Sequence, residues 1–201
     1  PSQNLVNAFK TENGLPMFDS YEKVHNSYPI NGVSSTQKYD PRLFHTVGMP
    51  SWPYKYEESW TMTTDNSRTP NTYGYYTSLK EVPQRSQGET YVEQTWQSFA
   101  MNDYVFRYTA VMLMRAEALI ETNDLSQARE IINDIRLRAA NSIDKHIRYA
   151  ADYCEISAYP TNYFQDKETA RQCLRWERRL EMAMESSRFF DLRRWGMAFE
   201  T

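Results

Sequence analysis

The chain has 201 residues, of which 40% are hydrophobic and 24% are charged, and its formal net charge at pH 7 is -3. This composition is typical of a globular domain with a sizeable core, and a small charge without long runs of one sign excludes a general electrostatic nucleic-acid binder. No stretch approaches the roughly 20 apolar residues that a membrane-spanning helix needs, and the first residues lack the pattern of a secretory signal.

Residues 1–101 are rich in Pro, Thr, Ser, Asn and Tyr, which favours loops and short extended pieces. A short helix is expected near the start, with Ser2 as its cap. The pair Asn13-Gly14 predicts a turn after that helix. Residues 39–43 contain a proline that predicts an extended entry into a short helix or strand.

The span 52–76 has no sustained periodicity and is expected to be a long loop, which in a compact domain is usually functional. If the segment 52–56 is extended, its alternating rings lie on one side. Flat rings interspersed with polar side chains suit carbohydrate or peptide ligands, so we predict ligand binding here. For any single ring, packing into the core is the favoured interpretation, and ligand contact is expected of the set as a whole. The candidates are Trp52, Tyr54, Tyr56, Trp60, Asp65, Arg68, Asn71, Tyr73, Tyr75 and Tyr76.

Residues 102–201 are rich in Ala, Leu, Met, Arg and Glu, which favours helices. Apolar residues at steps of three and four predict helices over 102–121, 125–140 and 167–186, and a last short helix is expected over 189–195. The short connection at Asn123-Asp124 predicts an antiparallel pair for the first two helices, with the proportions of a tetratricopeptide repeat. Because one such pair cannot bury both of its faces, we expect further helices against it.

Opposite charges in this helical half lie next to apolar positions, where the fork of an arginine suits partly buried carboxylates. We interpret these charges as an ion-pair network that fixes how the helices dock, and a cluster for an anionic ligand is the alternative. The residues assigned to this network are Arg107, Arg115, Glu117, Glu177, Arg179, Glu181 and Arg188.

Five blocks of the chain resemble, in the same order, segments of the SusD/RagB family of nutrient-binding proteins. The most specific block is 177–196, which begins Glu177-Arg178-Arg179 and ends Arg194-Trp195-Gly196. The other four blocks span 1–16, 39–43, 107–118 and 128–139. One departure is Ser186-Ser187, where the family has a glycine, and residues 45–100 match no block.

The resemblance implies a mostly helical fold with tetratricopeptide-like hairpins beside irregular loops. The chain would be the carboxyl-terminal half of such a protein, with 1–101 as a loop-rich ligand-binding region and 102–201 as a helical region of one larger domain. Family members are lipid-anchored on the outer face of the outer membrane through a cysteine that would lie upstream. They capture oligosaccharides, or peptides in some branches, and deliver them to a SusC-like TonB-dependent transporter, so neither catalysis nor a cofactor is expected.

The sequence also allows other functions. The ligand could be a peptide, or the helical hairpin could belong to a tetratricopeptide-type scaffold that binds a protein. A glycan hydrolase would need two carboxylates across a cleft, and Glu57, Glu58 and Asp65 have no evident partner. The histidines are scattered without a metal-ligand spacing, and Cys154 and Cys173 either pair or stay as two unrelated thiols.

Overall fold

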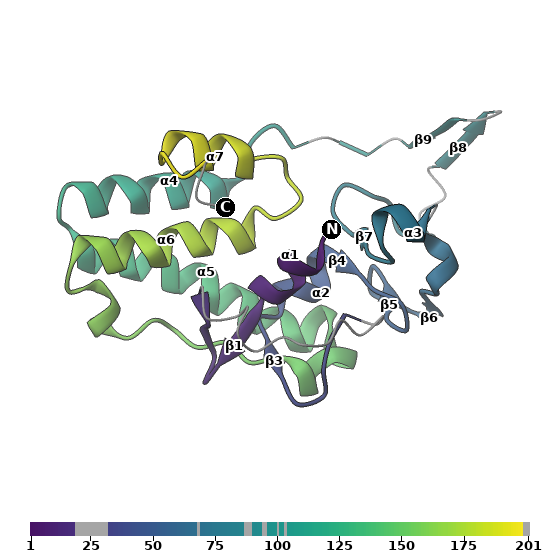
Figure 1. Ribbon diagram of the computed structural model, residues 1–201, viewed down its shortest axis with the longest axis horizontal. Coiled ribbons are helices and arrows are strands. Elements are labelled where there is room, and N and C mark those ends of the chain that lie inside the picture. Colours follow the sequence, from purple (N-terminus) through teal and green to yellow (C-terminus); the bar gives the residue numbers. More distant parts are fainter. Residues whose placement is uncertain are drawn as a thin grey trace.

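The computed structural model describes residues 1–18, 32–67, 69–86, 90–93, 96–99, 101–102 and 104–198. Figure 1 shows the long helices packed together at one end and short strands and helices at the other. The predicted mostly helical fold is therefore confirmed. Arg68, a predicted ligand-binding residue, lies outside the described residues.

The amino-terminal segment forms a short helix and a small sheet. The side chain of Ser2 accepts a hydrogen bond from the backbone N–H of Leu5, so the expected cap is confirmed. Asn13 and Gly14 make the expected turn with positive φ angles of 53° and 75°. A side chain at Gly14 would collide with Ser157, because an added Cβ would lie 2.2 Å from its hydroxyl oxygen. The elements are α1 (Gln3–Ala8), β1 (Lys10–Glu12), β2 (Leu15–Pro16), β3 (Lys38–Tyr39) and α2 (Arg42–Thr46), with β1 central and antiparallel to both neighbours.

The span expected as one long loop instead contains several short elements, so that prediction was wrong in detail. Its strands have two to five residues, too few for a periodic pattern to show in the sequence. Lys55 and Tyr56 have φ angles of 46° and 73° and make the turn of a hairpin, so Tyr56 does not continue an extended segment. The elements of this span are β5 (Pro53–Tyr54), β6 (Glu57–Thr61), η2 (Thr64–Asn66) and α3 (Pro70–Tyr73), and the flanking elements are β4 (Val47–Gly48), β7 (Thr77–Ser78), β8 (Thr90–Glu93) and β9 (Trp96–Phe99). β4 pairs with β7, β5 with β6, and β8 with β9.

The predicted helices are present, and α4 and α5 form the expected hairpin, with α6 packed against both (Figure 1). Asp124 caps α5, because its side chain accepts from the backbone N–H of Gln127. The elements are α4 (Tyr108–Glu121), α5 (Leu125–His146), η3 (Arg148–Tyr153), η4 (Thr161–Phe164), α6 (Lys167–Glu181) and α7 (Arg188–Arg194). Among the described residues, none of these helices combines the length and apolarity needed to cross a membrane.

Three predicted helix boundaries were wrong. The first helix starts at Tyr108 rather than near residue 102, because Arg107 is extended and its side chain is held by α6. The second continues six residues past the predicted end, to His146. The third stops at Glu181 because Met184 and Ser186 adopt left-handed φ angles of 65° and 61°.

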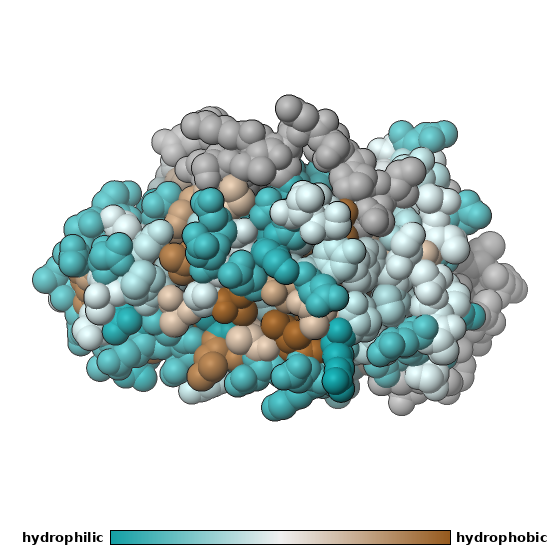
Figure 2. Space-filling view, turned by 90° about the horizontal axis from the view of Figure 1, so that it is seen from below, coloured by the Kyte–Doolittle hydropathy of each residue, from teal (hydrophilic) through white to brown (hydrophobic). Residues whose placement is uncertain are grey.

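The core consists of two clusters that α6 connects. One lies beneath α1, α2 and β4 and includes Trp176 and Leu180 of α6. The other lies between α4, α5 and α6 and includes Cys173 and Leu174. Cys173 is buried, Cys154 is half-buried, and both are free thiols. Figure 2 shows a largely hydrophilic face with apolar residues gathered near its middle.

Candidate functional site

An aromatic platform lies on the β5–β6 hairpin. The rings of Tyr54 and Trp60 meet edge to face, with centroids 5.1 Å apart. The guanidinium carbon of Arg85 lies 4.4 Å from the centroid of Trp60, and the hydroxyl of Tyr54 donates to the carbonyl oxygen of Pro83 at 3.1 Å. All three side chains remain at least partly accessible. We refer to Tyr54, Trp60 and Arg85 as the aromatic platform.

Two other predicted ligand-binding rings are turned toward the core. The ring of Trp52 lies 4.8 Å from that of Phe44 and 5.1 Å from that of Tyr153. The hydroxyl of Tyr76 donates to the side-chain oxygen of Gln3, and burial raises the pKa of Tyr76 to about 12. These two rings hold the hairpin region against the core.

The remaining candidates lie along η2, α3 and the segment that follows. Asp65 and Asn71 are exposed, and Tyr73 is 75% exposed on α3. Tyr75 is half-buried between α3 and β7. The described residues of the predicted set therefore divide into Tyr54 and Trp60 in the aromatic platform, Trp52 and Tyr76 against the core, Tyr56 in the hairpin turn, and these four along η2, α3 and the segment that follows.

A cavity of about 800 Å³ lies next to the hairpin, within the range of ordinary small-molecule sites. Six segments far apart in the chain surround it: α2, the hairpin turn, residues 79–81, residues 104–107, one face of α5, and the end of α6 with the turn beyond it. The hairpin turn contributes Lys55 and Tyr56, so the aromatic platform and the cavity belong to one continuous region.

A chain of hydrogen bonds fixes Tyr56 at the edge of the cavity. His45 Nδ1 lies 2.8 Å from the Tyr56 hydroxyl, and His45 Nε2 lies 2.8 Å from Ser142 Oγ. Ser142 donates its own proton to the carbonyl oxygen of Ala139 at 2.6 Å. Nε2 of His45 must therefore carry a hydrogen, and Nδ1 accepts from the tyrosine. Burial, together with the neighbouring His146, lowers the pKa of His45 to about 4, which keeps this ring neutral at pH 7.

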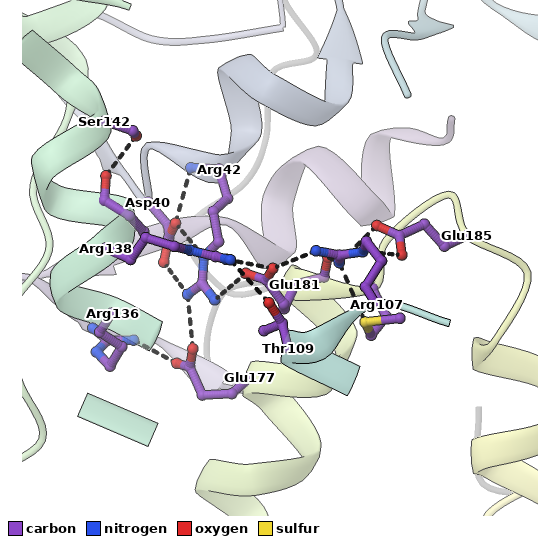
Figure 3. Close-up of polar contacts among 12 residues, drawn as sticks. Asp40, Arg42, Arg107, Thr109, Arg136, Arg138, Ser142, Glu177, Glu181 and Glu185 are labelled. Atoms are coloured by element: carbon purple, nitrogen blue, oxygen red, sulfur yellow. Dashed lines mark hydrogen bonds and ion pairs between the residues drawn. The ribbon is translucent and has the colours of Figure 1, made fainter. Parts of the chain in front are cut away.

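An ion-pair network forms the floor of the cavity (Figure 3). The carboxylate of Glu181 accepts hydrogen bonds from Arg107 at 3.1 Å and from Arg42 at 3.5 Å, and it also pairs with Arg138. Glu185 accepts two bonds from Arg107 at 2.8 Å and one from Lys80 at 2.6 Å. Burial raises the pKa of Glu181, but the charges of Arg42 and Arg138 outweigh this effect and lower it to about 2. Glu181 is therefore ionised, and both carboxylates are saturated with cationic partners.

A second layer of the network joins the two halves of the chain. Arg42 pairs with Asp40 at 2.6 Å and with Glu177 at 2.8 Å, and Arg136 donates to the other oxygen of Glu177. Arg136 also donates to the backbone carbonyl oxygens of Ser157 and Gly14 at 2.6 Å and 2.7 Å. Figure 3 shows how these side chains from the amino-terminal segment, α5 and α6 converge.

The structure brings only some of the predicted network residues together. Arg107, Glu177 and Glu181 are in the network, which also contains residues that the sequence analysis did not assign: Asp40, Arg42, Lys80, Arg136, Arg138 and Glu185. Asp40, Arg42, Arg136, Arg138 and Glu185 lie inside the blocks 39–43, 128–139 and 177–196, so the resemblance offered a signal for them. Lys80 lies in the unmatched span and carried no such signal.

The other predicted network residues make separate contacts. Glu117 binds Arg194 on α7 at 2.5 and 2.7 Å and accepts from the indole of Trp195 at 2.8 Å. Arg115 donates to Gln127 at 2.9 Å within the α4–α5 hairpin. The remaining two lie at the edges of α6 and α7: Arg179 donates to Asn4 and lies 4.9 Å from the ring centroid of Trp176, and Arg188 begins α7.

The region around the platform and the cavity combines groups that suit ligand binding. Among the described residues, no group of three or more His, Cys, Asp or Glu side chains could hold a metal ion. The carboxylate of Glu57 on the hairpin accepts from the backbone N–H and hydroxyl of Ser86 at 3.0 and 2.9 Å. What the region offers is aromatic rings, hydrogen-bonding groups and fixed charges around an open volume.

Comparison with known proteins identifies a family for the chain. No curated protein matches the chain. The family model described as the SusD family matches residues 1–201, which is the full length of the sequence. This match agrees with the resemblance of the five sequence blocks, three of which meet in the buried network around Glu177. The chain therefore belongs to the SusD family, the SusD/RagB group of nutrient-binding proteins of glycan uptake.

Proposed function

We propose that the protein captures oligosaccharides on the cell surface without chemically changing them. The observation that carries this proposal is the aromatic platform, which adjoins a cavity of about 800 Å³ through the hairpin turn. A sugar ring places its C–H face on an aromatic ring and its hydroxyls against polar groups. Trp60 and Tyr54 supply the rings, and Arg85 supplies donors beside them.

Membership of the SusD family supports the rest of the proposed role. We propose that the protein is lipid-anchored in the outer membrane through a cysteine upstream of the given sequence, and that it hands its ligand to a SusC-like TonB-dependent transporter. Such a delivery step needs a rigid base under the ligand. The ion-pair network between α2, α5 and α6 supplies that rigidity, because Glu181 alone pairs with Arg42, Arg107 and Arg138.

A peptide ligand is the second candidate, and one observation favours it. Side chains of both signs line the cavity, including Lys55 and Lys145 as well as Glu81 and Asp134. Charges of both signs would match a peptide's two termini and its ionisable side chains. Binding of peptides but not glycans would select this function within the same family.

Calorimetric titration of the purified protein with panels of oligosaccharides and peptides tests the proposal. We expect at least one oligosaccharide to bind, Trp60→Ala to weaken that binding about tenfold or more, and the matched control Phe190→Ala on α7 to leave it unchanged. Release of new reducing ends from a bound glycan would contradict a non-catalytic role. Binding that is insensitive to Trp60→Ala would contradict the assignment of the site.

A further inference from the structure

The side chains around the cavity carry a surplus of positive charge. Six of them are Lys or Arg: Arg42, Lys55, Lys80, Arg107, Arg138 and Lys145. Four are Asp or Glu: Glu81, Asp134, Glu181 and Glu185. The difference of six and four gives the lining a formal charge of about +2, in a chain whose net charge is -3. The cavity is therefore a local exception to the charge of the whole protein.

The acidic residues on the floor do not offer free negative charge to a ligand. Glu181 is only 4% exposed and receives three arginines, and Glu185 is shared by Arg107 and Lys80. Most of the hydrogen-bonding capacity of these carboxylates is already used, so a ligand would meet them as part of a neutralised surface.

Two lysines at the cavity differ from the other basic residues that line it. In the described part of the chain, neither Lys55 nor Lys145 forms an ion pair with a carboxylate. Lys55 donates to the backbone carbonyl oxygen of Val82, and burial lowers its pKa without a neighbouring acid to oppose the effect. A partly buried ammonium group beside a single carbonyl is suited to receive an anion, which would restore the interaction that burial weakens.

The groups around these lysines are those that a sugar requires. Tyr56 presents its ring at the cavity while His45 fixes its hydroxyl, and the side chains of Asn141 and Asp134 lie on the face of α5 that includes Lys145. An acidic sugar needs a ring for its C–H face, amide and carboxylate groups for its hydroxyls, and cations for its charge.

We propose that the cavity binds an acidic oligosaccharide and that Lys55 and Lys145 recognise its anionic group, a uronate carboxylate or a sulfate ester. This inference rests on the proposed function and narrows it to one class of glycan. The aromatic platform would bind a neighbouring sugar of the same chain, since the hairpin turn links the two surfaces.

The test compares charged oligosaccharides with neutral versions of the same molecules. Tetrasaccharides rich in galacturonate, mannuronate or glucuronate are titrated beside their methyl esters, and sulfated galactan oligomers beside their desulfated forms. We expect at least one acidic member to bind about tenfold more tightly than its neutral counterpart, with the preference shrinking as salt is raised. The arm that shows the preference identifies the anionic group as carboxylate or sulfate.

Variants then assign the preference to the lysines. In Lys55→Gln/Lys145→Gln the affinity for the acidic oligosaccharide should fall to that for its neutral counterpart. Lys167→Gln, at the opposite end of α6 from the cavity, is the matched control and should keep the full preference. A preference that survives the double substitution would overturn the assignment.

The outcomes separate this inference from the proposed function. Equal binding of acidic and neutral forms, with sensitivity to Trp60→Ala, would overturn the inference and leave glycan capture intact. Absence of binding to every glycan, acidic or neutral, would overturn both. Unchanged unfolding temperature in the double variant verifies that a lost preference reflects recognition and not a damaged fold.

Discussion

At the scale of single residues, two tryptophans eight positions apart have different environments. Trp52 packs against Phe44 and Tyr153 in the core, whereas Trp60 lies on the platform with Tyr54. We predict that Trp52→Ala lowers the free energy of unfolding by about 3 kcal/mol, at the low end for a buried tryptophan because the ring is only partly buried. Trp60→Ala should change it by less than about 1 kcal/mol. Denaturant unfolding of both variants measures this difference, and equal losses would contradict the placement of the two rings.

His45 should make the stability of the protein depend on pH. Its pKa is lowered to about 4 in the folded protein, first by burial and then by His146, from a value of about 6.5 in the unfolded chain. Between these values the unfolded state binds more protons, so stability is full above about pH 6.5 and falls as the pH drops toward 4, by about 1–3 kcal/mol. Unfolding titrations across this range measure the slope. His45→Gln should flatten it, and an unchanged slope would show that other groups are responsible.

Glu181 pairs with three arginines of the network in the described structure. Glu181→Gln removes the charge that Arg42, Arg107 and Arg138 share, and it deprives Arg42, whose side chain is only 7% exposed, of one of its three carboxylate partners. Breaking a buried pair of this kind costs about 3–5 kcal/mol of unfolding free energy. The control is Glu121→Gln, whose exposed pair with Arg171 should contribute less than about 1 kcal/mol. Similar losses of unfolding free energy in the two variants, measured by chemical denaturation, would show that the buried network contributes little to stability.

At the scale of elements, the turn between α6 and α7 departs from the glycine that the family uses. Ser186 has a φ angle of 61°, which costs a residue with a side chain about 1–2 kcal/mol, whereas Ser187 has an ordinary φ of -76°. We predict that Ser186→Gly stabilises the protein by about 0.5–1 kcal/mol after the larger entropy loss of glycine is included. Ser187→Gly, the matched control, should destabilise it by a similar amount. A melting temperature that falls in both variants would exclude the left-handed conformation at Ser186.

The sequence predicted the helices well because their patterns are long and local. The apolar stripes of α4, α5 and α6 repeat over many turns, and the caps Ser2 and Asp124 mark two helix starts. The predicted helix ends were wrong where tertiary contacts override the local conformational preference. Arg107 leaves the helical conformation because its side chain binds Glu181 and Glu185, and left-handed residues after Glu181 end α6 early.

The sequence predicted the type of site but not which residues form it. Composition located a ring-rich span, and the resemblance supplied a sugar as the expected ligand. Which rings face the core depends on partners far away in the sequence, such as Tyr153 for Trp52 and Gln3 for Tyr76. The cavity was not predictable for the same reason, because six segments between residues 42 and 185 surround it.

At the scale of the whole molecule, the buried network unites the loop-rich and helical halves. Asp40 and Arg42 come from the first half, and Arg136, Glu177 and Glu181 from the second. α6 also contributes to both core clusters, with Trp176 on one side and Leu174 on the other. The helices therefore act as a fixed base, and the hairpin with its platform is held on that base beside the cavity.

The outer face of this base has an unusual surface. Tyr108, Val111 and Met114 of α4 are 80%, 51% and 47% exposed, and Phe189 and Phe190 of α7 are 61% and 65% exposed. A helix that is apolar on nearly all sides is normally covered by other elements. This agrees with the expectation that a single helical hairpin needs further helices against it.

The position of a bound oligosaccharide is the most direct test of the account. A crystal structure of the protein with the tightest-binding glycan of the calorimetric panel would give that position. We predict sugar rings against Trp60 and Tyr54, with the same chain continuing into the cavity beside Lys55. A glycan bound on the outer face of α4 or α7, with the platform and the cavity left open to solvent, would contradict it.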